Sequence, residues 1–169
     1  QATKVFNFDR INKAGAKFDW DKLNWLNSQI LHEWSPDLML NALKPLWIQN
    51  GWVLPNEQWG KELATLLGPS LTLLNDGIEQ ARPFFEEPIL ETDGVNQLSI
   101  EGAKKALEAL ELHLEQNPWD GINQEEGKEI LSSIAAISEV KKGVLMKSLR
   151  AALLGKMQGP DLLTTWGLL

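Results

Sequence analysis

Residues 147–162 have the sequence KSLRAALLGKMQGPDL, in which a helix pattern runs directly into a turn. The apolar residues of this region and just before it recur at helical spacing and predict one buried helix face. They are Leu145, Leu149, Ala152, Leu153 and Met157. Lys147 and Arg150 lie three positions apart and share another face. Gly159 and Pro160 predict a turn. We therefore expect a docked helix with a cationic ridge, followed by an exposed loop.

The charges are distributed unevenly along the 169 residues, whose formal net charge is −7. Residues 76–129 hold fourteen acidic and four basic side chains, whereas residues 140–169 hold five basic and one acidic. The overall charge argues against non-specific nucleic-acid binding, but the basic C-terminal segment permits a focused contact with an anion. A solvated helix face is the simpler explanation of this cluster, and both interpretations remain open.

Composition narrows the class of protein. Apolar residues make up 43% of the chain, which is normal for one ordinary core or two small ones. There is no cysteine, which excludes disulfides and thiolate metal sites. We see no stretch long and apolar enough to span a membrane and no signal peptide, so we expect a cytoplasmic protein. The chain begins with Gln1, which indicates a processed product or part of a longer protein.

Helix signals follow one another, and no segment alternates with period two, so we expect an all-α fold. The predicted helices are, in chain order, residues 19–32, 35–50, 55–67, a segment after Gly68-Pro69 that ends near residue 81, then 99–115, 123–140, the cationic segment after Gly143, and 160–166. Asp19, Ser35, Ser99 and Asn123 are the expected N-cap residues. Pro45 predicts a kink or an early end of the second helix. Gly143 is expected to separate the sixth helix from the cationic one.

Residues 82–97 differ from their surroundings. Pro83, Pro88 and Gly94 interrupt short apolar pairs there, which is typical of a connector. We therefore expect a first helical subdomain in residues 1–85, a connector in residues 86–97 and a second helical subdomain in residues 98–169.

No recognisable motif brings catalytic or metal-binding residues together. His32 and His113 lie in separate predicted helices without a second histidine or a cysteine nearby, which favours structural or surface roles. The phosphate-binding patterns GxxxxGK[ST] and GxGxxG and the nucleophile pattern GxSxG are absent. We expect no catalytic, cofactor-binding or metal-binding residue in this chain.

The eight tryptophans have two interpretations, because an indole can pack in a core or stack on a nucleic-acid base. Trp25, Trp47 and Trp59 lie beside apolar helical positions and are expected in the core. Trp166 lies near the cationic helix, and for it both roles remain open.

Two segments resemble the bacterial-type glutamyl-tRNA synthetases. FDRINKAGAKFD (8–19) with KLNWLN (22–27) is similar to the stretch that links the catalytic part of that family to its anticodon-binding part. LRAAL (149–153) with GPDL (159–162) is similar to the C-terminal signature. The order and separation also match, so the resemblance covers nearly the whole chain. It implies two small helical bundles that form a cage around the tRNA anticodon loop.

The resemblance also implies that this chain and the rest of the enzyme have different tasks. The full-length enzyme attaches glutamate to tRNA with ATP and Mg²⁺, through two class I motifs that lie upstream and are absent here. This chain would recognise tRNA-Glu, as a monomer and without binding DNA or a membrane. The positions that match Arg150 and Leu162 lie at the anticodon in the family, and Lys147 and Lys156 are expected to contact phosphates or base edges. The alternative function is a helical adaptor that docks a basic partner on the acidic face of residues 101–129.

Gly68 departs from the family pattern. Relatives that charge only tRNA-Glu carry Arg before the proline that matches Pro69, and this Arg discriminates the third anticodon base. Glycine removes both the bulk and the charge, which predicts that tRNA-Gln is accepted as well. The other interpretation is that Gly68 merely ends a helix. Ser148 also departs from the family, which often has proline there, so the local backbone is an open question.

Overall fold

A computed structural model describes residues 19–169 and confirms the all-α prediction: helices and short 3-10 turns account for the regular structure in this range, without a strand. The elements are α1 (Trp20–His32), α2 (Pro36–Gln49), α3 (Glu57–Leu67), η3 (Gly68–Ser70), α4 (Asp76–Ala81), η4 (Arg82–Phe84), α5 (Thr92–Leu98), α6 (Ala103–Gln116), α7 (Gln124–Ile137), α8 (Lys142–Leu154) and α9 (Leu162–Leu168).

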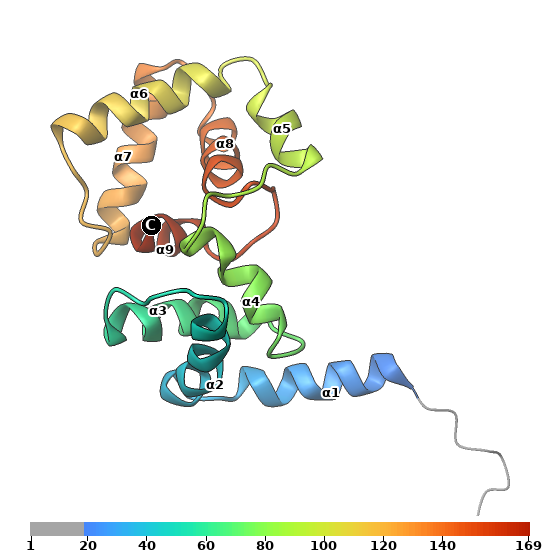
Figure 1. Cartoon of the computed structure of the whole chain (residues 1–169). Coiled ribbons are helices and arrows are strands. Elements are labelled where there is room, and N and C mark those ends of the chain that lie inside the picture. The colour runs from blue at the N-terminus through green and yellow to red at the C-terminus, as the bar shows by residue number, and fades with distance from the viewer. Residues whose placement is uncertain (1–18) are drawn as a thin grey trace, which may run out of the picture.

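The helices form two groups around two hydrophobic cores (Figure 1). In the first group, α1 to α4, Leu43, Trp47 and Leu63 are fully buried. In the second, α5 to α9, Leu131 and Leu145 are fully buried. Leu154 at the end of α8 belongs to the first core and so joins the two groups. The expected subdomain limits at residues 85 and 98 stay a prediction.

Side-chain caps begin several helices where the sequence predicts them. Asp19 accepts a hydrogen bond from the Lys22 amide at 3.0 Å, and Ser35 accepts one from the Leu38 amide at 3.3 Å. The Asn123 side chain accepts hydrogen bonds from the amides of Glu125 and Glu126. Each cap satisfies amides that have no partner inside the helix, and a local sequence signal is sufficient to place it.

Other helix limits differ from the prediction. Asn56, not Pro55, begins α3, because its side chain accepts from the Trp59 amide at 2.8 Å. Pro45 does not shorten α2, which continues to Gln49. Gly143 lies inside α8, and Glu139, with a φ of 57°, makes the reversal before it.

The prediction that Ser99 caps a helix is wrong. Ser99 ends α5, and α6 begins only after Gly102, whose φ of 85° is left-handed. The segment expected as an irregular connector thus contains α5. A tertiary contact stabilises this helix, because Gln97 donates a buried hydrogen bond of 3.1 Å to the Ser148 hydroxyl on α8. Ser148 itself is a regular helix residue.

The tryptophan predictions hold in part. Trp47 is fully buried and donates to the Gly77 carbonyl at 3.0 Å. Trp59 is half-buried and meets the Phe85 ring edge-on. Trp25 is 59% exposed, so its prediction as a core residue is wrong. The predicted stripe of Leu23, Leu26 and Ile30 on the same helix is exposed as well, and Leu31 is the buried residue of α1.

Candidate nucleic-acid interface

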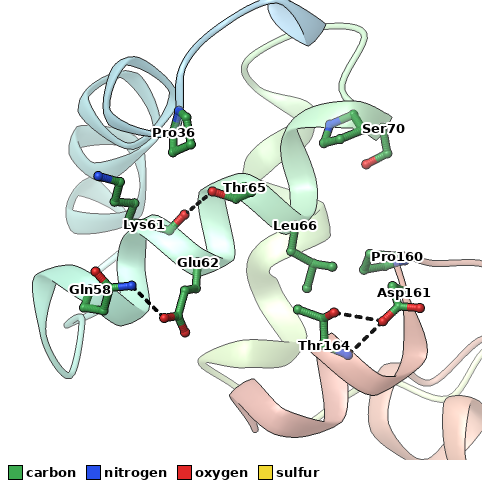
Figure 2. Close-up of a pocket in the computed structure, with 11 residues that line it drawn as sticks. Pro36, Gln58, Lys61, Glu62, Thr65, Leu66, Ser70, Pro160, Asp161 and Thr164 are labelled. Atoms are coloured by element: carbon green, nitrogen blue, oxygen red, sulfur yellow. Dashed lines mark hydrogen bonds between the residues drawn. The ribbon is translucent and has the colours of Figure 1, made fainter. Parts of the chain in front are cut away.

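A central hollow of about 640 Å³ lies between the two helix groups. One wall is α3 with the end of η3 and Pro36 of α2, and the other is the beginning of α9 with the proline before it (Figure 2). Its lining residues are Pro36, Gln58, Lys61, Glu62, Thr65, Leu66, Pro69, Ser70, Pro160, Asp161 and Thr164. Figure 2 shows Leu66 and Thr164 facing each other from opposite walls.

Two smaller hollows adjoin the central one. The Gly68 hollow, about 260 Å³, shares Pro36, Thr65 and Pro69 with it. The loop hollow, about 320 Å³, shares Ser70 and Pro160 with it and extends to Lys156. The three hollows adjoin at these shared residues, and we call them together the junction cleft. The cleft runs from Gly68 on the first group to the loop between α8 and α9.

The loop of residues 155–161 is fixed to the rest of the chain at several points. Gly155 ends α8 with a φ of 77°, and its carbonyl accepts from the Glu91 amide at 2.8 Å. The Asp93 carboxylate accepts from the Met157 amide at 3.2 Å. The Lys156 ammonium lies 3.8 Å from the Glu91 carboxylate. These contacts hold one wall of the loop hollow in place before any ligand arrives.

Arg150 completes the anchoring of this loop. Its guanidinium donates to the Pro160 carbonyl at 2.6 Å, and the side chain is half-buried. Burial alone raises the pKa of the neighbouring Asp161 carboxyl. The backbone and side-chain hydrogen bonds from Thr164 and the charge of Arg150 outweigh that effect, and the pKa of Asp161 is lowered. An ionised Asp161 then caps α9, which starts one residue later.

The structure brings Gly68, Lys156 and, through Pro160, Arg150 to the junction cleft. It does not bring the other two predicted site residues to its walls. Lys147 is exposed on α8 and makes no ion pair within residues 19–169. Leu162 is 4% exposed and packs in the second core, so its side chain points away from a ligand in this conformation.

Gly68 occupies an ordinary right-handed position, with φ −44° and ψ −49°, and is buried at the point where α3 passes into η3. A Cβ atom there would lie 3.2 Å from the terminal methyl of Met39. The backbone conformation therefore does not require glycine, and the space available is set by a flexible side chain.

Several polar residues of the cleft were not predicted. The Ser70 hydroxyl lies 2.5 Å from the Gln80 amide oxygen, which leaves the amide nitrogen of Gln80 available as a donor in the loop hollow. Lys61 pairs with Asp37 at 2.7 Å. These side chains come from separate helices and follow no common spacing, so no pattern in the sequence groups them.

Within residues 19–169, no three histidine or acidic side chains gather in a way that could hold a metal ion. None of the helices in this range is both long and apolar enough to cross a membrane.

A protein-family model matches most of the chain. The model of the anticodon binding domain family matches residues 34–169, which include every helix from α2 to α9 and all lining residues of the junction cleft apart from Leu31 and His32.

Curated relatives agree with this match. The chain is 64% identical to a glutamate–tRNA ligase of Synechococcus sp. (strain CC9311) and 62% identical to one of Prochlorococcus marinus (strain MIT 9303). Both alignments cover 100% of this chain and 36% of the relative. The chain thus spans about a third of the length of these curated relatives.

Solved structures show the same fold. A glutamate tRNA ligase from Elizabethkingia meningosepticum superposes with a TM-score of 0.78 at 24% identity, over 96% of this chain and 32% of that one. The glutamate–tRNA synthetase of Elizabethkingia anophelis gives a TM-score of 0.76 at 22% identity, over 96% of this chain and 31% of that one.

Proposed function

The chain belongs to the anticodon binding domain family, and from this we propose that it is the part of a glutamate–tRNA ligase that recognises the anticodon loop of tRNA-Glu. The observation that carries the proposal is the junction cleft. It lies between two helix groups and combines apolar walls with polar side chains from both. The match to an anticodon binding domain favours RNA recognition over the alternative that the main function is that of an adaptor for a basic protein.

The cleft suits unpaired bases. Anticodon nucleotides are single-stranded, so their faces can stack on apolar surfaces and their edges can form hydrogen bonds. Pro36, Leu66 and Pro160 offer such surfaces in the central hollow. In the loop hollow, the Gln80 amide can donate to a base edge, and Lys156 can contact a phosphate or a base.

Lys147 acts in this proposal as a phosphate contact outside the walls of the cleft. An exposed ammonium without an ion-pair partner attracts a phosphate at little cost in lost contacts. Arg150 acts mainly through the loop it holds. The contact of Leu162 with a base, implied by the resemblance, requires α9 to shift, because the side chain is now part of the second core.

The remaining two thirds of the parent ligase supply the chemistry in this proposal. That part would bind ATP, Mg²⁺ and glutamate and esterify the tRNA, while this chain positions the anticodon end. We further propose that the parent acts as a monomer in the cytoplasm, where tRNA is charged.

Binding to altered tRNAs tests the function. We expect tRNA-Glu to bind more tightly than a variant in which the three anticodon nucleotides are replaced, and the affinity to fall as salt rises. Lys156→Ala should weaken binding and reduce the salt slope by about one. Lys105→Ala on α6, outside the cleft, is the matched control. Equal affinity for both tRNAs, measured by filter binding with the chain and with the parent ligase, would refute the proposal.

We also propose that tRNA-Gln is accepted, because Gly68 presents neither bulk nor charge to the third anticodon base. In such an organism an amidotransferase would have to convert the glutamate on tRNA-Gln to glutamine. The test compares the affinities of the two tRNAs. A preference for tRNA-Glu above about 100-fold, or roughly 2.7 kcal/mol, contradicts the proposal.

A further inference from the structure

A separate apolar groove of about 870 Å³ lies between α6 and α8 in the second helix group, with Trp166 of α9 beside it. None of its lining residues also lines the junction cleft. They are Leu98, Lys104, Leu107, Glu108, Leu110, Glu111, Leu114, Glu115, Leu149, Ala152, Leu153 and Trp166. α6 runs across the top of the second group in Figure 1 and contacts both α7 and α8, and its residues from Lys104 to Glu115 line one edge of the groove.

The floor of the groove is built into the second core. Leu110 and Leu149 are 3% and 5% exposed, so they are fixed by packing below the groove. Leu107, Leu114 and Trp166 are half-buried walls that retain apolar surface toward solvent. Trp166 is itself supported by Trp119, with 4.3 Å between the ring centroids. A rigid apolar floor of this kind can receive apolar anchors from a partner without first rearranging.

The rim of the groove is acidic. Glu108, Glu111 and Glu115 follow one another along α6 at spacings of three and four residues, so they share one face. Lys104 lies 3.5 Å from Glu108 and compensates that charge, whereas Glu111 and Glu115 make no ion pair within residues 19–169. Like charges four residues apart repel each other, and Glu115 also lies in the last helical turn, where the helix dipole disfavours an acid.

The negative charges on the rim of the groove repel RNA and attract a cationic partner. A phosphate backbone would be repelled from an edge that combines two uncompensated carboxylates with the carbonyl end of α6. A cationic side chain placed there would remove the repulsion and gain two partners. The groove therefore combines apolar complementarity on its floor with positive charge complementarity on its rim.

We propose that this groove docks a cationic amphipathic helix of a partner protein. The lining residues of α6 extend from Lys104 to Glu115, about 17 Å or three helical turns. A helix of that length presents apolar side chains at positions i, i+3 or i+4 and i+7 to the floor, and Lys or Arg on its flank to the rim. The proposal does not depend on tRNA recognition, because the two surfaces share no residue.

A synthetic peptide tests the docking chemistry directly. The probe is an amphipathic helix of about 12 residues with leucines on one face and lysines on its flanks. A peptide of the same composition with the leucines scrambled off that face is the first control, and one with glutamates in place of the lysines is the second. We expect only the first peptide to bind the chain in isothermal titration calorimetry, and its resonance shifts on labelled protein to map to α6, α8 and Trp166.

Matched variants decide whether the groove is responsible. Glu111→Lys combined with Glu115→Lys should weaken the probe at least about tenfold, and Ala152→Lys, which places a cation in the groove, should do the same. Glu101→Lys combined with Glu129→Lys makes the same charge change on exposed residues outside the groove and should change the affinity less than about twofold. The first three substituted positions are all exposed, so the fold is retained.

Three outcomes would overturn the inference. They are equal binding of the scrambled peptide, equal weakening by the control pair, and displacement of the probe by tRNA-Glu. The last would show that the groove belongs to an RNA surface or is coupled to one. Loss of tRNA binding with retained peptide binding would instead contradict the proposed function alone.

Discussion

The guanidinium of Arg150 donates a 2.6 Å hydrogen bond to the carbonyl oxygen of Pro160, ten residues further along the chain. This bond fastens the end of the loop that forms one wall of the junction cleft to the cationic helix α8. The residue expected to meet a base thus first serves the protein's own backbone. Its substitution should affect both folding and tRNA binding.

Arg150→Met should therefore lower the free energy of unfolding by about 1.5–3 kcal/mol, because it leaves the Pro160 carbonyl without its charged donor. Lys147→Met on the same helix should change that free energy by no more than about 0.5 kcal/mol, because Lys147 is exposed and unpaired in the described structure. Urea unfolding measures both. Equal stability of the two variants would show that the Arg150 bond does not anchor the loop.

Gly68→Arg should weaken tRNA-Gln selectively, at least about tenfold relative to tRNA-Glu. Gly68→Ala is the matched control, because it introduces the same Cβ contact with Met39 without the charge or the length. The Ala variant should bind both tRNAs as the unchanged chain does. If Arg weakens both tRNAs equally, Gly68 does not govern discrimination.

Asp161→Asn should reveal that the Asp161 carboxylate makes a pH-dependent contribution to the free energy of unfolding. The pKa of Asp161 is lowered in the folded state, so the unfolded state takes up a proton more readily, and stability from this group rises with pH. The contribution is fully present above the ordinary value of 3.8 and is lost as pH falls through the lower folded pKa.

Asparagine can still cap α9 but carries no charge toward Arg150. We therefore expect the unchanged chain to be more stable than Asp161→Asn at pH 7, and the difference to shrink in acid. Urea unfolding at a series of pH values measures this difference in the free energy of unfolding. A difference that is constant with pH would contradict the charge interaction.

Two glycine-to-alanine substitutions should have opposite effects on stability. At Gly94 in α5, a Cβ atom would collide with the Gly155 carbonyl group, which is backbone and cannot turn away. Gly94→Ala should cost about 1–3 kcal/mol, the range typical of overpacking. At Gly143 in α8, nothing lies within 4 Å of the added atom. Gly143→Ala should stabilise the helix by up to about 1 kcal/mol. Thermal unfolding of both variants checks the prediction, and a loss of stability at Gly143 would contradict it.

Trp47→Phe should destabilise the first helix group. The indole is fully buried and its nitrogen donates to the Gly77 carbonyl at 3.0 Å, so phenylalanine leaves both a void and an unsatisfied acceptor. We expect a loss of about 2–4 kcal/mol. Trp25→Phe, on the exposed face of α1, should be nearly neutral. Similar losses for both tryptophans in urea unfolding would contradict the burial in the structure.

Local chemistry explains which parts of the fold could be predicted from sequence. A cap such as Asp19 or Asn123 acts within three residues, so the sequence contains all the information that places it. Ser99 carries the same type of side chain and failed as a prediction. The competing arrangement, α5 packed against α8 through Gln97 and Ser148, depends on residues about fifty positions apart.

The candidate site also contains residues that the sequence could indicate and residues that it could not. Gly68 and Lys156 could be singled out by resemblance and charge, and both line the junction cleft. The environment of Leu162 could not be predicted, because its apolar side chain suits a base or a core equally well; it packs in the second core, and its contact with a base stays a prediction. No pattern in the sequence indicated Gln80 as a site residue.

The sequence by itself determined the helical class, most helix starts, and the positive charge near the C-terminal end, because each of these depends on neighbours within one or two turns. Tertiary structure alone decided that Leu154 of α8 packs in the first core, that hollows open between the two groups near Pro69 and Pro160, and that α6 keeps an acidic edge over an apolar groove. Such features arise where side chains from distant segments meet, and burial then selects one arrangement among many that the local pattern permits.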